Sequence, residues 1–151
     1  MRLWHKSLIG ILPRQQLTGQ WRECCLIAKN ISEKGSPNHV LVNRIMDYPL
    51  EHFYVYSRVV YLTMRTRGYN AQWPKFTQYL DLGPALPGLQ MKDLFPEWHN
   101  DKYLVQCFNN LQEKHDCGAI TDEAWEPILN FFFIRKVEEL CPLKPSASNE
   151  A

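Results

Sequence analysis

The chain has 151 residues, of which 45% are hydrophobic and 22% are charged, with a formal net charge of +1. The length suits one domain, and the composition excludes a wholly disordered chain, a collagen-like fibre and a disulfide-dense miniprotein. No apolar run approaches the ~20 residues that span a bilayer, so we expect no membrane partner.

The cysteines and the first residues indicate the compartment. The start is basic, but its apolar stretch is short and no small-residue cleavage site follows, so we expect no signal peptide. Five cysteines are an odd number, and no C-x-x-C pair occurs. We interpret them as free thiols of a cytoplasmic protein, and we expect no metal or other cofactor.

Charge is divided unevenly along the chain. Residues 1–70 carry ten Lys and Arg against four acidic residues, whereas residues 71–151 carry seven against twelve. A half that is this basic is typical of a protein that faces a polyanion. The alternative is that folding mixes these charges into a neutral surface.

Two long helices are predicted in the first half of the chain. The first runs from about Pro13 to Glu33, and Gly35 stops it. The second runs from about Pro49 to Arg67. Proline suits the first turn of a helix and glycine the residue after its end, and both segments have apolar residues at three- and four-residue spacing.

The second half is predicted to be less regular. Residues 71–99 contain four prolines and read as a long loop that holds one short turn near 76–80. A third helix is predicted from about Asn100 to Lys114. A fourth begins near Thr121, with Pro127 limiting or bending its start.

The predicted fold is therefore all-α. We expect a compact single-domain bundle of three to four helices, with the long Pro-rich loop between the second and the third. The helical domain covers residues 1–141, and residues 142–151 form a flexible C-terminal tail.

The middle of the first helix carries the sharpest chemical pattern. Glu23 follows Trp21 and Arg22 and precedes an apolar run. A carboxylate beside an apolar face can take a shifted pKa and act in proton transfer, although Arg22 and Glu23 can also simply cover a helix surface. Gly19, one turn earlier, costs about 1 kcal/mol relative to alanine, and one reason for it is the close approach of another group.

The order and spacing of these residues resemble a known family. They are Met1-Arg2-Leu3-Trp4, Gln15-x-Leu17-x-x-x-Trp21-Arg22-Glu23, Arg67-Gly68-Tyr69-Asn70 and, more loosely, Asn110 to Lys114. In this pattern the chain is similar to the pyrimidine-dimer DNA glycosylase/AP-lyase family, of the phage endonuclease V type. The resemblance covers residues 1–70 well and 100–135 weakly. The chain departs from it at Leu26, where the family has a basic residue.

The resemblance implies an all-α fold in which the N-terminal segment threads between helices. It implies that the α-amino group of Met1 attacks C1′ of a damaged nucleotide and forms an imine, and that Glu23 assists the sugar chemistry. It further implies that Arg22, Arg2 and Lys114 contact double-stranded DNA at a damaged or abasic site. An α-amino group titrates near ~7.7–8.0, well below lysine, so more of it is a neutral nucleophile at pH 7. We expect a monomer.

Two other interpretations stay open. The first is a non-catalytic helical module that binds DNA or protein and has kept the family fold. The second is an unrelated helical enzyme that uses Glu23 with His5. Among the aromatic residues, Trp73, Trp98 and Trp125 can stack on or wedge into DNA, with a core role for at least one of them.

Overall fold

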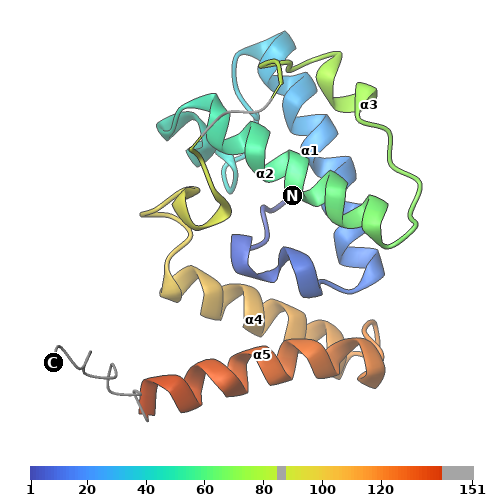
Figure 1. Ribbon diagram of the computed structural model, residues 1–151, viewed down its shortest axis with the longest axis vertical. Helices are drawn as coiled ribbons and strands as arrows, with labels where there is room; N and C mark the ends of the chain where they lie inside the picture. The colour runs from blue at the N-terminus through green and yellow to red at the C-terminus, as the bar shows by residue number, and fades with distance from the viewer. Residues whose placement is uncertain (85–87, 141–151) are drawn as a thin grey trace, which may run out of the picture.

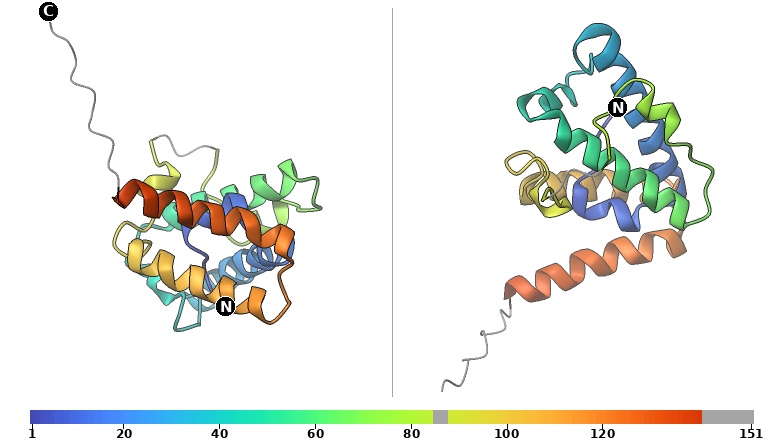
Figure 2. Two further views of the ribbon diagram at one scale, coloured as in Figure 1. Left: turned by 90° about the horizontal axis from the view of Figure 1, so that it is seen from below. Right: turned by 45° about the horizontal axis from the view of Figure 1, so that its top comes forward.

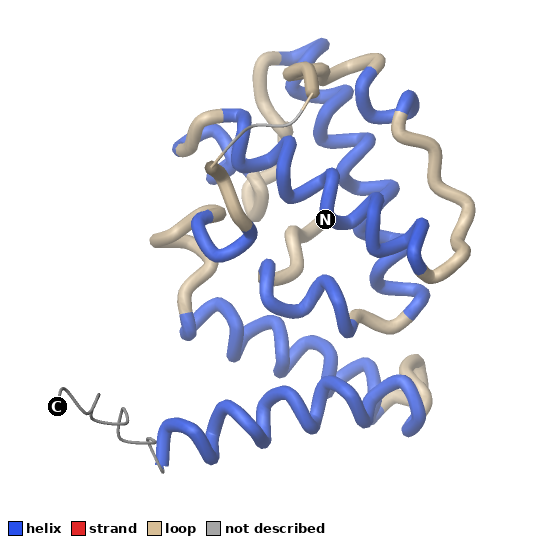
Figure 3. Tube along the Cα trace, in the orientation of Figure 1, coloured by secondary structure: helices blue, strands red, loops and turns tan. Residues whose placement is uncertain are grey.

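The computed structural model describes residues 1–84 and 88–140. In chain order the elements are η1 (Lys6–Ile11), α1 (Arg14–Lys34), η2 (Asn43–Asp47), α2 (Leu50–Thr66), α3 (Pro74–Thr77), η3 (Met91–Asp93), α4 (Asp101–Asp116) and α5 (Asp122–Leu140), where η marks a 3-10 helix. The described residues hold no strand, so the prediction of an all-α fold is confirmed (Figure 3). Within these residues no helix is both long and apolar enough to pass through a membrane.

The two long helices of the first half form where the sequence predicts them. α1 begins after Pro13 and ends at Gly35, which adopts the left-handed conformation with φ of 75°. α2 likewise begins after Pro49. The two helices pack against each other and bury the apolar stripe of each (Figure 1). The buried residues of these two stripes include Leu17, Trp21, Cys24, Ile27, Phe53, Tyr56 and Val60.

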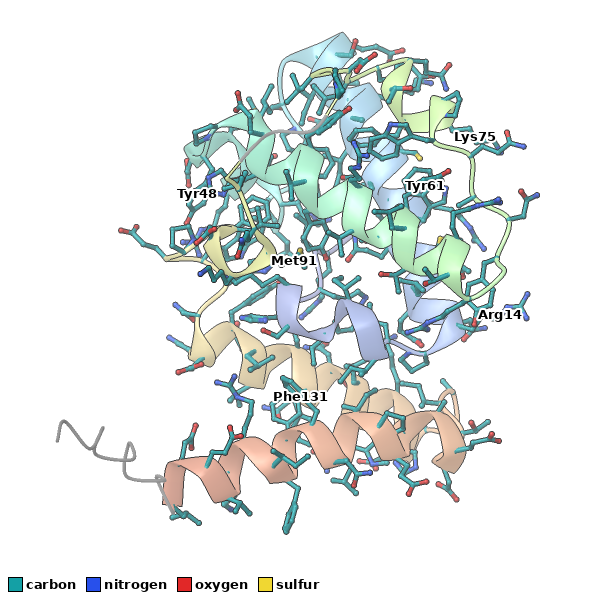
Figure 4. All side chains as sticks on the ribbon, in the orientation of Figure 1. Arg14, Tyr48, Tyr61, Lys75, Met91 and Phe131 are labelled. Carbon is teal, nitrogen blue, oxygen red and sulfur yellow. The ribbon has the colours of Figure 1, made fainter. Side chains whose placement is uncertain are left out.

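The segment from 71 to 99 is more ordered than a loop. It contains α3, which begins two residues before the expected turn, and η3. Phe76, Leu94, Phe95 and Trp98 are buried in the main core. The segment follows the outside of the bundle, and in Figure 4 the labelled Lys75 and Met91 mark two places along it. Its large apolar side chains anchor it to the core.

The last two helices pair along one side of the molecule. The side chain of Asn100 accepts a hydrogen bond from the Tyr103 N–H at the start of α4. α5 runs unbroken through Pro127, so the expectation that this residue limits the helix start is wrong. Pro127 is the sixth residue of the helix, so it removes the one hydrogen bond that its N–H would donate to the Glu123 carbonyl oxygen. The predicted flexible tail, 142–151, lies outside the described residues.

The N-terminal segment runs through the interior. Residues 1–5 are extended, and η1 lies between α2 and the α4–α5 pair (Figure 1). Leu3, Trp4 and Leu8 are buried. Met1 and Arg2 are partly buried, whereas residues 3–5 are buried. In the left panel of Figure 2, the N-terminus lies on the same side of the molecule as the segment between α1 and η2.

Candidate active site at the N-terminus

The structure brings Met1 and Glu23 together. The nitrogen of the Met1 amine lies 3.8 Å from Oε1 of Glu23. The second carboxylate oxygen, Oε2, accepts a hydrogen bond from the Arg2 backbone N–H at 3.0 Å. The Met1 side chain is 13% exposed and that of Glu23 is 33% exposed. An amine and a carboxylate thus lie close together in a partly buried position.

Gln20, one turn before Glu23 on α1, holds the segment that carries the amine. Its Oε1 accepts the Trp4 backbone N–H at 2.8 Å, and its Nε2 donates to the Arg2 carbonyl oxygen at 3.0 Å. Gln20 is 1% exposed. The Gln20 amide therefore satisfies backbone groups of the extended segment that a neighbouring strand would pair with in a sheet.

Two tyrosines complete this support. The hydroxyl of Tyr56, on α2, donates to the Trp4 carbonyl oxygen at 2.6 Å, and the hydroxyl of Tyr103, on α4, donates to the carbonyl oxygen of Leu3. Burial raises the pKa of both hydroxyls above its usual value, so they stay protonated donors. Side chains from α1, α2 and α4 therefore fix the direction in which the chain delivers Met1.

A pair of stacked histidines anchors the next residues. His5 Nδ1 accepts from Ser7 N–H at 3.1 Å, so its Nε2 carries the proton and donates to the carbonyl oxygen of His99 at 2.8 Å. His99 Nδ1 in turn accepts the Lys6 N–H at 3.0 Å. Burial lowers the pKa of His5 to about 4 and that of His99 to about 2, and both rings are neutral. His5 is thus engaged with His99, and the structure does not bring it to Glu23.

Gly19 does not serve the N-terminus. No atom lies within 4 Å of the position that a Cβ would take there. The N-terminal segment is therefore not the group whose close approach Gly19 is expected to allow, because Gln20 and Glu23 hold that segment by their side chains. The space beside Gly19 is open to a ligand.

Arginines adjacent to the pair line two different hollows. Arg2 lines a hollow of about 460 Å³ together with Arg44 and Lys102. Arg22 lines another of about 440 Å³ with Lys75. Each hollow contains cations from both the basic half of the chain, residues 1–70, and the acidic half, residues 71–151. The positive charge beside the pair therefore does not come from the basic half alone.

Lys114 lies apart from these two hollows. It occupies the last turn of α4, and its carbonyl oxygen accepts the backbone N–H of Ala119 at 2.8 Å. The hollow that it lines contains neither Met1 nor the arginines of the site, as far as the described residues show. The structure does not bring Lys114 to Glu23.

The tryptophans are largely committed to packing. Trp98 and Trp125 are 3% and 7% exposed. Trp73 is half-buried and stacks on Phe76 with ring centroids 4.9 Å apart. Trp98 and Trp125 are therefore core residues, in line with the core role expected for at least one of the three, and Trp73 keeps part of its ring exposed.

Two of the thiols lie on α1 close to Glu23 and are held in the protonated form by burial. Cys24, Cys25, Cys107 and Cys117 are free, while Cys141 lies outside the described residues. Burial raises the pKa of the Cys25 thiol to about 11 and raises that of Cys24 still further. The part of the chain that the structure describes holds no group of three or more His, Cys, Asp or Glu placed to bind a metal ion.

Comparison with known proteins identifies the family of this chain. The sequence model of the family described as pyrimidine dimer DNA glycosylase matches residues 1–77. The matched part contains η1, α1, η2, α2 and α3, and with them the amine, the carboxylate and Gln20. The chain belongs to the pyrimidine dimer DNA glycosylase family. No curated protein and no solved structure matches it.

Sequence reasoning missed the residues that position the amine. Gln20 lies three residues after Leu17 and four before Cys24, in the middle of a buried apolar stripe. A lone amide on such a stripe is a signal that it pairs with a buried backbone segment. Tyr56 and Tyr103 gave no such signal, because tyrosine fits an apolar stripe without a polar partner.

Proposed function

We propose that this protein is a DNA-repair enzyme, a glycosylase with AP-lyase activity that acts on damaged pyrimidines through an imine formed by the N-terminal amine. The membership in the pyrimidine dimer DNA glycosylase family supports a role on damaged DNA. The observation that carries the mechanism is the 3.8 Å separation between the Met1 nitrogen and Glu23 Oε1.

The amine is the nucleophile of the proposed reaction. The neutral amine attacks C1′ of the damaged nucleotide, the bond between C1′ and the base breaks, and the nitrogen loses a proton. The C1′–O4′ bond then breaks, which opens the sugar ring, leaves a C1′=N imine and gives O4′ a proton. An amine held within contact distance of its assisting group avoids much of the entropy cost of bringing them together. The hydrogen bonds of Gln20 and Tyr56 to the N-terminal segment support this placement.

Glu23 stabilises charge and moves protons. The role we propose for Glu23 is not activation of the amine. Its negative charge instead stabilises the cationic sugar as the base leaves. Later it accepts the proton whose removal from the sugar allows strand cleavage.

The DNA lies across both hollows beside the pair in this proposal. Arg2 and Arg22 hold phosphates on opposite sides of the lesion, and Lys114 is a more remote backbone contact. The substrate is double-stranded DNA with a damaged or abasic site, and the enzyme works as a monomer. The free thiols favour a reducing compartment, and we propose the cytoplasm.

Borohydride trapping on an abasic duplex tests the proposal. Reduction of the imine links the wild-type protein covalently to DNA. We expect Glu23→Gln to lower strand cleavage by ~10²-fold or more while trapping persists, because the amine is untouched. Acetylation of the N-terminus should abolish trapping with Glu23 in place. Glu33→Gln, on the exposed side of the same helix, is the matched control and should behave as wild type.

Two results would contradict the proposal. Full strand cleavage by Glu23→Gln together with trapping of the acetylated protein would remove both residues from the reaction. Binding of abasic DNA without any trapping would instead identify a non-catalytic DNA-binding module.

A further inference from the structure

Two aliphatic side chains project from the turn between α1 and η2. Val40 is 80% exposed, the largest value for any bulky hydrophobic residue among those described, and Leu41 is 55% exposed. Exposure of one such residue is ordinary, but two adjacent ones at the tip of a turn point to a contact with a partner.

The turn that carries these side chains is held in place by hydrogen bonds. The His39 N–H donates to Asn43 Oδ1 at 3.0 Å, and the His39 carbonyl oxygen accepts the backbone N–H of Val42 at 3.0 Å and of Asn43 at 2.9 Å. Val42 and Ile45 are fully buried behind it. The protein therefore presents Val40 and Leu41 outward from an anchored base.

Positive charge surrounds the same two residues. Val40 and Leu41 line the hollow of about 460 Å³ that also contains Arg2, Arg44 and Lys102. Glu97 is the one acidic residue in its lining. None of the three cations has a carboxylate within 4.0 Å in the described part of the chain.

Trp98, which also lines the hollow, holds the Arg44 side chain in position. The Arg44 guanidinium lies over the ring of the buried Trp98, 5.7 Å from its centroid. Stacking on the ring orients the guanidinium without neutralising its charge, so it remains available to an anion.

The hollow adjoins the proposed reaction centre through the chain itself. Arg2, which lines it, follows Met1 directly and donates its backbone N–H to Glu23. The left panel of Figure 2 shows the N-terminus and the segment before η2 on one side of the molecule. A partner that occupies the hollow therefore contacts Arg2, the residue that follows Met1 in the chain.

We propose that duplex DNA is this partner and that Val40 and Leu41 form an apolar wedge, which enters the base stack beside the lesion while Arg2, Arg44 and Lys102 hold the flanking phosphates. The inference rests on the proposed function and adds to it the way in which the lesion is opened. Apolar tips flanked by cations suit a duplex, because aliphatic wedges unstack base steps while phosphates take the positive charges. A protein partner would have to supply several unpaired acidic groups around an apolar pocket.

Base unstacking can be measured with 2-aminopurine next to a non-cleavable abasic analogue in a duplex. Saturation with wild-type protein should raise the fluorescence as the neighbouring base loses its stacking. We expect Val40→Ala/Leu41→Ala to reduce this rise by about threefold or more and to leave the salt dependence of binding unchanged. Arg44→Gln should lower the log–log salt slope by about 0.9, and the fluorescence rise should persist at saturation.

The matched control is Leu62→Ala/Leu129→Ala, which removes two half-exposed leucines from α2 and α5. It should give the wild-type fluorescence. An unchanged rise in the Val40→Ala/Leu41→Ala protein would overturn the wedge. So would a change in its sedimentation coefficient without an optical change, which would place the turn between copies of the chain.

Trapping on an abasic duplex separates this inference from the proposed function. If the wild-type protein is trapped but the Val40→Ala/Leu41→Ala protein unstacks the base equally well, only the wedge is wrong. If the wild-type protein unstacks the base through Val40 and Leu41 but is never trapped, only the chemistry is wrong. A wild-type protein that does not bind the duplex overturns both.

Discussion

Glu23 contacts two nitrogen groups of the N-terminal segment, each through a different oxygen. The Met1 amine lies beside Oε1, and the Arg2 backbone N–H donates to Oε2. One carboxylate thus both orients the chain end and faces the atom that we propose as nucleophile. Because Glu23 makes both contacts, the effect of its charge and the effect of its position need separate tests.

A substitution at Gly19 tests whether a ligand occupies the space next to Glu23 on α1. Gly19→Ala should raise the free energy of unfolding by up to about 1 kcal/mol, because alanine favours the helix and the added Cβ meets no atom. If the sugar of the lesion occupies that space, the same methyl group should lower kcat/KM on abasic DNA about tenfold. Urea unfolding and a cleavage time course give the two values.

Gly10→Ala is the control for this substitution. A Cβ at Gly10, in η1, also meets no atom within 4 Å, but Gly10 lies in a different part of the fold from Glu23. We expect its cleavage rate to match the wild type. A Gly19→Ala protein that is more stable and fully active would show that no ligand comes close to this face of α1.

At the scale of elements, the N-terminal segment is extended but pairs with side chains instead of with a neighbouring strand. Its backbone groups from Arg2 to Trp4 pair with the side chains of Gln20, Tyr56 and Tyr103. These partners come from three helices, and they lie up to 100 residues away along the chain. The placement of the amine therefore depends on the assembled bundle.

Tyr56→Phe tests that dependence. Loss of the hydroxyl leaves the buried carbonyl oxygen of Trp4 without its donor, which should cost about 1–3 kcal/mol of stability. Because the amine then has more freedom, the rate of borohydride trapping should fall about tenfold. Quench-flow trapping at saturating abasic DNA measures it.

Tyr54→Phe is a matched control on the same helix. Its hydroxyl donates to the carbonyl oxygen of Gly83 at 3.0 Å, away from the N-terminal segment. We expect a stability loss of about 0.5–1.5 kcal/mol and an unchanged trapping rate. Equal effects of the two substitutions on trapping would mean that general loosening, rather than placement of Met1, governs the rate.

At the scale of the whole molecule, the buried histidines link stability to pH. Burial lowers the pKa of His5 to about 4 and that of His99 to about 2 in the folded protein. In the unfolded chain both titrate near ~6.5, so below that pH the unfolded state binds more protons than the folded state. Their contribution to stability is complete above pH ~6.5 and is lost as the pH falls.

The free energy of unfolding should therefore decrease between pH 6.5 and pH 4. With up to two extra protons taken up on unfolding, the slope approaches about 2.7 kcal/mol per pH unit. His99→Gln keeps an acceptor for the Lys6 N–H and should reduce that slope by about half. Urea titrations at pH 7, 6 and 5 measure this slope. A urea midpoint that does not change with pH would contradict the neutral state of His5 and His99.

Much of the helical architecture could be predicted from the sequence because its signals are local. Pro13 and Gly35 mark the two ends of α1, and Pro49 marks the start of α2. The prediction of a loop over 71–99 with one short turn near 76–80 placed that turn two residues late relative to α3 and missed η3, because prolines favour turns and because burial of Phe76 depends on helices elsewhere in the chain.

The sequence by itself determined the helical periods, their stops and the family pattern that includes Glu23. Only the tertiary structure decided where the N-terminal amine lies, which cations share a hollow and which aromatic rings are already packed. The physical reason is the range of the interactions. A helix closes its hydrogen bonds within four residues, whereas the segment from Met1 to Trp4 has no periodic pattern and finds its partners on α1, α2 and α4.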